Sequence, residues 1–538
     1  MAANASARGI PAPLAGVAGI AAVVLGAGLG ELAAAVLAPS SSPVAAIGAA
    51  LIDLAPPWAK DTAIALFGTA DKIALLAGIA LVMLALAAFA GWLEVRFPPW
   101  GAVVVAGFGV AGAVIAATRP GAGALAWLPS AVAGATGAVA LWLLARLLRR
   151  SLASPTSAAP ADPQERTDAA TAGPPDADTP RPPSRRAFFA WAGAATAVGI
   201  VAVGVGSLRS TASAGVAAAR RALRLPTPAV AASAVPAGAE LGLPGLAEVV
   251  TPNDRFYRID TALIVPEVDP ADWRLRIHGM VANEVELTWD DVLALPLEES
   301  WTTLACVSNE VGGTLIGNAR WLGYPVRELL ARARPDTDAD MVLSRSIDGF
   351  TASTPLEALT DARNAILAVG MNGEPLPLEH GFPARLVVPG LYGYVSATKW
   401  VTDLEVTRFD RATAYWTTRG WSERGPIKLQ SRIDVPRRGQ GLKAGEVVIA
   451  GVAWQQQVGI EAVEVRIDEG EWMPATLAAA ISDDTWVQWS HPWDATPGDH
   501  VIQCRATSRT GEVQTEQTAP PAPDGATGWH WRTVSVFD

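Results

Sequence analysis

The chain has 538 residues, half of them hydrophobic, and a formal net charge of −11 at pH 7. This balance argues against a nucleic-acid partner, because no basic stripe is present to neutralise phosphates. Two cysteines are too few for a disulfide scaffold, and five scattered histidines give no zinc motif. Half-apolar composition is too hydrophobic for one soluble protein, so part of the chain is expected in a membrane.

The hydrophobic excess lies before residue 210. Five apolar stretches each approach the roughly 20 residues that a helix needs to cross a bilayer. They run over 13–37, 73–92, 101–118, 124–145 and 187–208. We therefore predict a four-span membrane domain over 1–150 and a fifth transmembrane helix over 187–208, with membrane lipid as a partner. Prolines and charges interrupt 43–67, which is predicted to be interfacial or re-entrant.

Residues 151–186 are rich in Pro, Ala, Asp and Thr and are predicted to form a disordered linker. Three arginines follow the fourth apolar stretch and three precede the fifth: Arg146, Arg149, Arg150, Arg181, Arg185 and Arg186. The positive-inside rule places this linker in the cytoplasm and the chain after residue 210 outside the inner membrane. The Arg185–Arg186 pair before an apolar run also resembles a twin-arginine export signal; the alternative is that these arginines only set topology.

From about residue 245 the composition is that of a soluble protein. Strand-like runs alternate with helical patterns near 289–294 and 325–333, which predicts an α+β domain over 245–410. After about 425 strand-like runs dominate, and their regular spacing predicts an all-β immunoglobulin-like (Ig-like) sandwich over 425–538. The strand-like runs lie at 273–278, 341–344, 384–388, 447–454, 462–467, 485–489 and 501–505.

The two cysteines stand in different contexts. Cys504 lies in an alternating run that predicts a strand. Cys306 follows an apolar run and precedes a polar, Gly-containing loop, which is typical of a strand-to-loop junction. A thiolate at such a junction can bind a soft metal or attack an electrophile. The alternative is a small buried core residue.

Four separated segments resemble, in order, the sulfite oxidase family of molybdopterin enzymes, in its membrane-anchored bacterial branch. They are 251–260 (TPNDRFYRID), the stretch around Cys306, 380–390 (HGFPARLVVPG) and 396–400 (SATKW). The resemblance covers about 245–535. It implies a sulfite-oxidase-like molybdopterin domain followed by a sandwich like the family's dimerisation domain, and therefore a possible homodimer.

The resemblance implies a molybdenum–molybdopterin cofactor with Cys306 as the metal ligand. One cysteine is enough because molybdenum prefers sulfur and the pterin supplies the other sulfurs. The expected cofactor-binding residues are Asn253, Phe256, Tyr257, Arg258, Cys306, His380, Arg385, Ser396, Thr398 and Lys399. Arg385 can hold the terminal phosphate bidentately and Lys399 as a point charge. The alternatives are surface ion pairs for these two cations and an ordinary hydrogen-bonded histidine for His380.

Three positions depart from the sulfite-oxidising pattern. Ile259 and Val311 stand where that branch places arginines, and Phe350 stands where it places a tyrosine. Only Arg419 keeps a plausible catalytic charge on the substrate side. A pocket without its cationic clamp should bind sulfite poorly, because buried anions need paired charges. A register shift of one residue would bring Arg258 into the pocket instead.

These observations predict a membrane-anchored, extracytoplasmic molybdopterin oxidoreductase that moves an oxo group to or from a small substrate other than sulfite. No haem- or flavin-binding motif is visible, so electrons would be exchanged with an external electron-transfer protein or a quinone. One alternative is a sulfoxide reductase-like enzyme. The other is a non-enzymatic Ig-like binding protein that retains the cofactor fold as a scaffold.

Overall fold

The computed structural model describes residues 11–38, 41–44, 46–48, 71–118, 123–152, 185–208, 211–262 and 264–538. It divides into two compact units, Met1–Ala212 and Ser213–Asp538. The predicted interfacial segment 43–67 and the linker 151–186 lie almost entirely outside the described residues.

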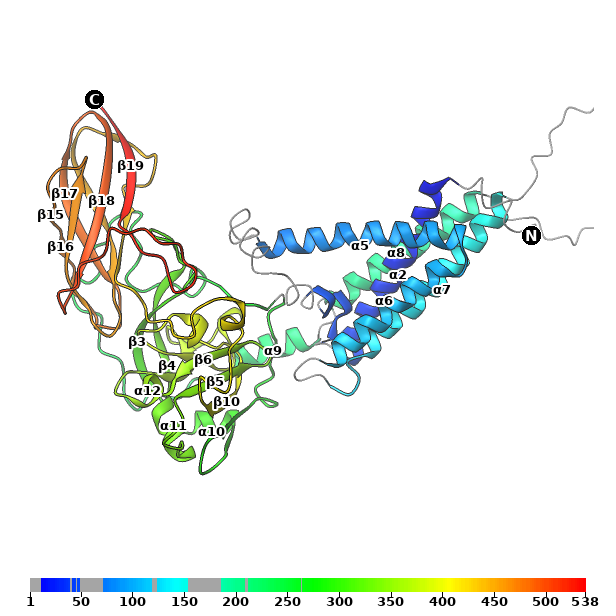
Figure 1. Ribbon diagram of the computed structural model, residues 1–538, viewed down its shortest axis with the longest axis horizontal. Coiled ribbons are helices and arrows are strands. Elements are labelled where there is room, and N and C mark those ends of the chain that lie inside the picture. Colours follow the sequence, from blue (N-terminus) through cyan, green and yellow to red (C-terminus); the bar gives the residue numbers. More distant parts are fainter. Residues whose placement is uncertain are drawn as a thin grey trace, which may run out of the picture. The chain divides into compact units, whose positions relative to one another are not determined.

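Five long apolar helices make up most of the described part of the first unit: α2 (Ala12–Leu37), α5 (Asp71–Arg96), α6 (Trp100–Ala117), α7 (Leu128–Leu152) and α8 (Arg185–Leu208) (Figure 1). Among the described residues, these five are long and apolar enough to cross a membrane, by length and composition. They occupy the five apolar stretches predicted from sequence. The main difference is α7, which continues past the predicted end of its span to include Arg149 and Arg150.

Small residues allow these helices to approach closely. A side chain at Gly28 of α2 would overlap the backbone of α8 at Gly199, and one at Gly109 of α6 would overlap α7 at Gly134. Such contacts are typical of helices packed in an apolar solvent, where close van der Waals contact replaces the hydrophobic effect.

The second unit begins with two sheets that form the predicted α+β domain. One has the order β3-β4-β7-β8, with β9 on β7, and the other has the order β2-β1-β10-β5-β6. Among the pairs within these two sheets, β1 and β10 run parallel and the others are antiparallel. The strands are β1 (Arg274–Gly279), β2 (Val285–Thr288), β3 (Glu298–Ala305), β4 (Ile316–Pro325), β5 (Met341–Ser346), β6 (Thr351–Pro355), β7 (Ile366–Met371), β8 (Glu374–Pro375), β9 (Arg385–Val387) and β10 (Val401–Thr407).

Four short helices accompany these sheets: α9 (Thr211–Ala222), α10 (Trp289–Leu293), α11 (Val326–Ala333) and α12 (Leu356–Thr360). Helix α11 lies in the helical run predicted near 325–333, and its buried residues Val326, Leu329, Leu330 and Ala333 recur at the spacing of one helix face. Helix α10 begins at a capping box in which the side chains of Thr288 and Asp291 each accept from the other's backbone amide.

The C-terminal part is all β. Its strands are β11 (Gln430–Val435), β12 (Gly441–Lys443), β13 (Gly445–Trp454), β14 (Ile460–Ile467), β15 (Met473–Pro474), β16 (Thr476–Leu477), β17 (Val487–Ala495), β18 (Gly498–Ser508) and β19 (His530–Phe537) (Figure 1). They form two sheets, β11-β13-β17-β16 and β12-β19-β18-β14-β15. Both sheets contribute to one core, which includes Ile449, Trp489, Ile502 and Cys504. Cys504 lies on β18, as predicted.

Candidate active site

Cys306 is the first residue after β3, at the predicted strand-to-loop junction. Its amide donates to the carbonyl of Leu315 (2.9 Å), and its carbonyl accepts from Asn309 N (3.1 Å). The side chain is buried, with 7% of the residue exposed. Burial raises the pKa of the Cys306 thiol, and hydrogen bonds from Ser308 together with the charge of Lys399 oppose that rise. Burial outweighs these effects, so Cys306 stays a thiol until a bound metal removes its proton.

Aromatic residues from 251–260 pack beside Cys306. The Phe256 ring lies 5.2 Å from Tyr257, 5.8 Å from Trp321 and 5.5 Å from His380, measured between centroids. Burial and the neighbouring Cys306 raise the pKa of Tyr257 above its ordinary value, so its phenol stays protonated. The predicted cofactor-binding residue Tyr257 thus lies close to the predicted metal ligand.

His380 is a buried neutral imidazole. Its Nε2 lies 3.0 Å from the carbonyl oxygen of Asn253, which can only accept, so Nε2 carries the proton and Nδ1 is an acceptor. Burial and the nearby Arg385 lower the pKa of His380 to about 4. The Asn253 amide itself is engaged with Met371 O (3.3 Å) and with Asn372 (2.8 Å). Asn253 and His380 therefore form one fixed arrangement.

Arg385 is a buried cation held by backbone carbonyls. Its guanidinium donates to His380 O (3.1 Å), Leu386 O (3.3 Å) and Ala397 O (3.4 Å), and it stacks over Trp321 at 5.2 Å. In the part of the chain that the structure describes, no carboxylate lies within ion-pair distance of it. Burial lowers the pKa of Arg385 to about 10. A buried charge is costly unless paired, so this position suits an anionic ligand such as a phosphate.

Lys399 is also buried, but it has a carboxylate partner that the sequence did not reveal. Its Nζ lies 2.6 Å from Asp260 Oδ2 and donates to Glu379 O at 2.9 Å. Asp260 also pairs with Arg258 (2.9 Å). Burial lowers the pKa of Lys399 to about 8, against the opposing effect of Asp260. The predicted cations Arg258 and Lys399 therefore share one carboxylate, and neither is a surface ion pair of two exposed partners.

Ser396 and Thr398 support the turn that carries Lys399. Both are completely buried. The Ser396 hydroxyl donates to Tyr392 O (2.9 Å), and the Thr398 hydroxyl lies 2.7 Å from Ser344 Oγ. The structure therefore engages both predicted hydroxyls within the protein, where they fix the backbone around Lys399.

Arg419 and Phe350 both contact the ring of Tyr415. The Arg419 guanidinium carbon lies 3.5 Å from the centroid of Tyr415, and the Phe350 ring lies 5.8 Å from it. Ring contacts continue from Tyr415 through Trp416 and Trp421 to Tyr394. Sequence reasoning missed this aromatic group; the repeated aromatics of 415–421 were its only signal.

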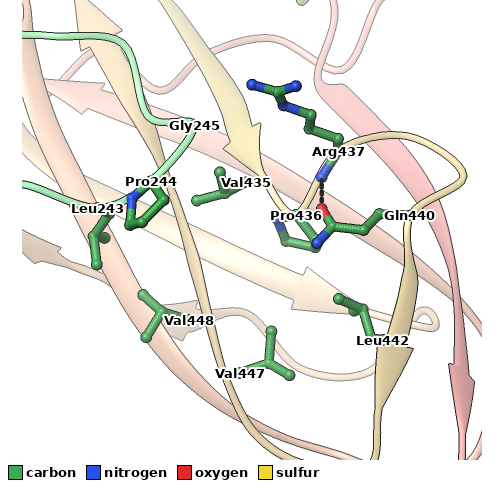
Figure 2. Close-up of a pocket in the computed structure, with 10 residues that line it drawn as sticks. All are labelled: Leu243, Pro244, Gly245, Val435, Pro436, Arg437, Gln440, Leu442, Val447 and Val448. Atoms are coloured by element: carbon green, nitrogen blue, oxygen red, sulfur yellow. Dashed lines mark hydrogen bonds between the residues drawn. The ribbon is translucent and has the colours of Figure 1, made fainter.

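A separate surface pocket of about 540 Å³ lies between the 243–245 segment and the C-terminal sheets (Figure 2). Its walls are mainly aliphatic. The one charged side chain, Arg437, extends away from them, while its amide donates to Gln440 Oε1 at 2.9 Å. None of the predicted site residues lines this pocket, so it is distinct from the surroundings of Cys306.

The charge of Lys399 should make anion binding depend on pH. In full-length, cofactor-free protein in detergent, we expect sulfate to raise the melting temperature at neutral pH. This stabilisation should fade as the pH rises through about 8, because unliganded Lys399 then loses its proton and binding requires taking one up. Sulfate keeps a constant charge in this pH range, so any pH dependence of its binding comes from groups of the protein.

The matched variant is Lys399→Arg, which stays charged and should keep the sulfate stabilisation in alkaline solution. The groups that face Lys399 are Asp260, Arg258 and Arg385. Equal stabilisation of the wild-type protein on both sides of pH 8 would contradict an anion site at Lys399.

Comparison with known proteins agrees with this geometry. Residues 262–416 match the family model of the oxidoreductase molybdopterin-binding domain. Human mitochondrial sulfite oxidase is 30% identical over 321 residues, covering 50% of this chain and 58% of that protein. The uncharacterized oxidoreductase YuiH of Bacillus subtilis is 33% identical over 157 residues, covering 29% of this chain and 76% of that protein.

Among solved structures, the sulfane dehydrogenase SoxCD of Paracoccus pantotrophus is 24% identical, with a TM-score of 0.48, and the match covers 55% of this chain and 85% of that one. The chain spans 62% of the macaque sulfite oxidase and 58% of the human one. The matched domain binds molybdopterin, and the buried thiol and cations fit that group, so the cofactor is the molybdenum–molybdopterin of this family. The chain belongs to the sulfite oxidase family of molybdopterin-binding oxidoreductases.

Proposed function

We propose that this protein is a membrane-anchored, extracytoplasmic oxidoreductase that moves an oxo group to or from a small substrate. The observation that carries the proposal is the position of Cys306 directly after β3, where its thiol is close enough to Tyr257 and Lys399 to interact with them electrostatically. The molybdenum cofactor supplies the redox chemistry when bound, and the protein supplies binding and orientation.

Each residue has a definite task in this proposal. Cys306 supplies a thiolate to the metal, and Arg385 and Lys399 hold the terminal phosphate. His380 presents Nδ1 as an acceptor, because its Nε2 proton is committed to Asn253. Tyr257 keeps its proton and can donate a hydrogen bond next to Cys306.

The direct test is a screen of sulfoxides, N-oxides and sulfite with the purified full-length protein, using artificial electron donors and acceptors. We expect turnover with at least one oxo donor or acceptor, and none in the Cys306→Ser variant.

Sulfite should be a poor substrate. Ile259 and Val311 replace two expected arginines, and Arg258, the alternative cation, is already paired with Asp260. Ile259 is 45% exposed, so water reaches this position, and neither it nor Val311 supplies a cation to pair with a bound anion. Steady-state assays with sulfite and an artificial acceptor should therefore show a Michaelis constant far above micromolar. A micromolar constant would mean that the pocket is cationic and would assign Arg258 to it.

The membrane placement rests on the arginines that flank the fourth and fifth apolar stretches. We propose that 146–186 lie in the cytoplasm and that the second unit lies outside it, with export of a folded domain through the Arg185–Arg186 signal. A cysteine placed in 151–183 should resist an impermeant thiol reagent in intact cells. One placed at Ser482, in the second unit, should react. Labelling of the linker cysteine alone would reverse the topology.

The C-terminal domain is proposed to be an Ig-like sandwich that forms a homodimer. Support comes from its two sheets with a common core. Electrons would be exchanged with an external protein or a quinone. The family assignment favours an oxidoreductase over the non-enzymatic binding protein, and metal analysis of the purified chain separates the two.

A further inference from the structure

The turn that carries Cys306 contacts the C-terminal sheets. After Cys306 the chain folds back so that Asn309 Oδ1 accepts from Leu315 N at 2.8 Å, and Gly313 N donates to Glu310 O at 2.8 Å. Gly312 has a φ of +77°, which favours glycine. A side chain on Gly312 would also overlap the imidazole of His530. The turn 306–313 is therefore shaped by a close external contact.

Arg432 of β11 makes the polar contact to this turn. Its Nη1 donates to Gly313 O at 2.8 Å, and its Nε donates to Asp434 Oδ1 at 2.6 Å. Arg432 is 5% exposed and Asp434 is 9% exposed. Asp434 also accepts from Ala247 N at 3.0 Å. Asp434 therefore fixes the direction in which the Arg432 guanidinium points.

The second contact is equally constrained. The amide of Ile433, the residue after Arg432, donates to His530 Nδ1 at 2.9 Å, so the His530 proton is on Nε2. His530 Nε2 and Cδ2 are the atoms closest to the place where a Cβ on Gly312 would lie. Two neighbouring residues of β11 therefore define both contacts to the turn: Arg432 binds it directly, and Ile433 orients His530.

A buried ion pair is poor evidence for stability, because desolvation offsets its attraction. Such a pair is well suited to fix geometry. We propose that Arg432 is a positioning residue for Cys306: the C-terminal domain, beyond any role in dimerisation, holds the turn that presents the metal ligand. The proposal rests on Cys306 being that ligand, but the coupling of Arg432 to the turn can be measured without metal.

The first test uses full-length, cofactor-free protein and the rate at which iodoacetamide alkylates each cysteine, read by peptide mass spectrometry. Cys504, completely buried in the sandwich core, is the internal reference. Arg432→Met should raise the alkylation rate of Cys306 about tenfold, because the turn loses a hydrogen bond from a charged donor. Cys504 should not become faster, because the Arg432 charge favours its thiolate and the variant removes that charge. The matched control is Arg505→Met, which removes another sandwich arginine paired with Glu464.

Arg432→Lys covers the case in which the Met variant does not fold. It keeps the charge but cannot bind Gly313 and Asp434 as a fork, so we expect an intermediate rate. An unchanged Cys306 rate in a folded Arg432 variant would overturn the proposal. Equal acceleration of Cys306 and Cys504 would do the same, because it would mean general destabilisation.

The second test uses the loaded protein and the electron paramagnetic resonance signal of molybdenum(V). Arg432→Met should shift this signal, Arg432→Lys should move it back toward wild type, and Arg505→Met should leave it unaltered. An identical signal in wild type and Arg432→Met would contradict the proposal. If the purified chain holds no molybdenum, the proposed function fails, while the alkylation result still decides whether Arg432 positions Cys306.

Discussion

Replacement of Cys306 by Ser is expected to abolish turnover while the fold and the bound pterin remain. A hydroxyl is a poor substitute for a thiolate on a metal that prefers sulfur. Residues that only support metal ligands cost about 10- to 100-fold when removed, so loss of the ligand itself should cost at least about 100-fold. The pterin should stay bound because Arg385 and Lys399 are untouched. Activity, released pterin and circular dichroism are measured together.

The control for this variant is Cys504→Ser, the same chemical change in the sandwich core. Cys504 accepts a hydrogen bond from Ser431 Oγ at 3.2 Å, so a serine there keeps a polar partner. We expect that variant to retain turnover. Wild-type turnover in Cys306→Ser would reject Cys306 as the ligand.

Replacement of Arg385 by Met should remove the cofactor. Arg385 is buried among carbonyls, and a bound phosphate would lose its planar, bidentate partner. An uncompensated buried charge costs about 3–5 kcal/mol, which corresponds to a loss of affinity of roughly two to four orders of magnitude. Molybdenum and pterin per purified chain should fall together.

A matched control is Arg408→Met, which removes a surface arginine paired with Asp410 at 2.9 Å and should leave cofactor content unaltered. Full cofactor content in a folded Arg385→Met protein would show that the phosphate lies elsewhere. Cofactor loss in both variants would point to general instability.

The fold could be predicted to a large extent from local patterns. Apolar runs located all five long helices, because the length needed to span a bilayer is independent of tertiary contacts. The helix predicted near 325–333 and the strand-to-loop junction predicted at Cys306 were correct for the same reason: neighbouring residues dictate them. The boundaries of the domains and the Ig-like topology remain predictions.

The site could be predicted only as far as its motifs reach. Cys306, Arg385 and Lys399 were predicted from short sequence segments. In the structure, Lys399 and Tyr257 lie close enough to Cys306 to interact with it electrostatically. The pairing of Lys399 with Asp260 spans 139 residues, and Arg432 reaches Gly313 across 119. No local pattern encodes contacts between such distant positions.

The central claim is that this chain holds molybdenum through Cys306. Molybdenum K-edge X-ray absorption of the purified full-length protein tests it most directly, with the Cys306→Ser variant measured beside it. We expect about one molybdenum per chain, two sulfur neighbours from the pterin and a third from Cys306 that disappears in the variant. Absence of molybdenum, or the same sulfur shell in both proteins, would contradict the account.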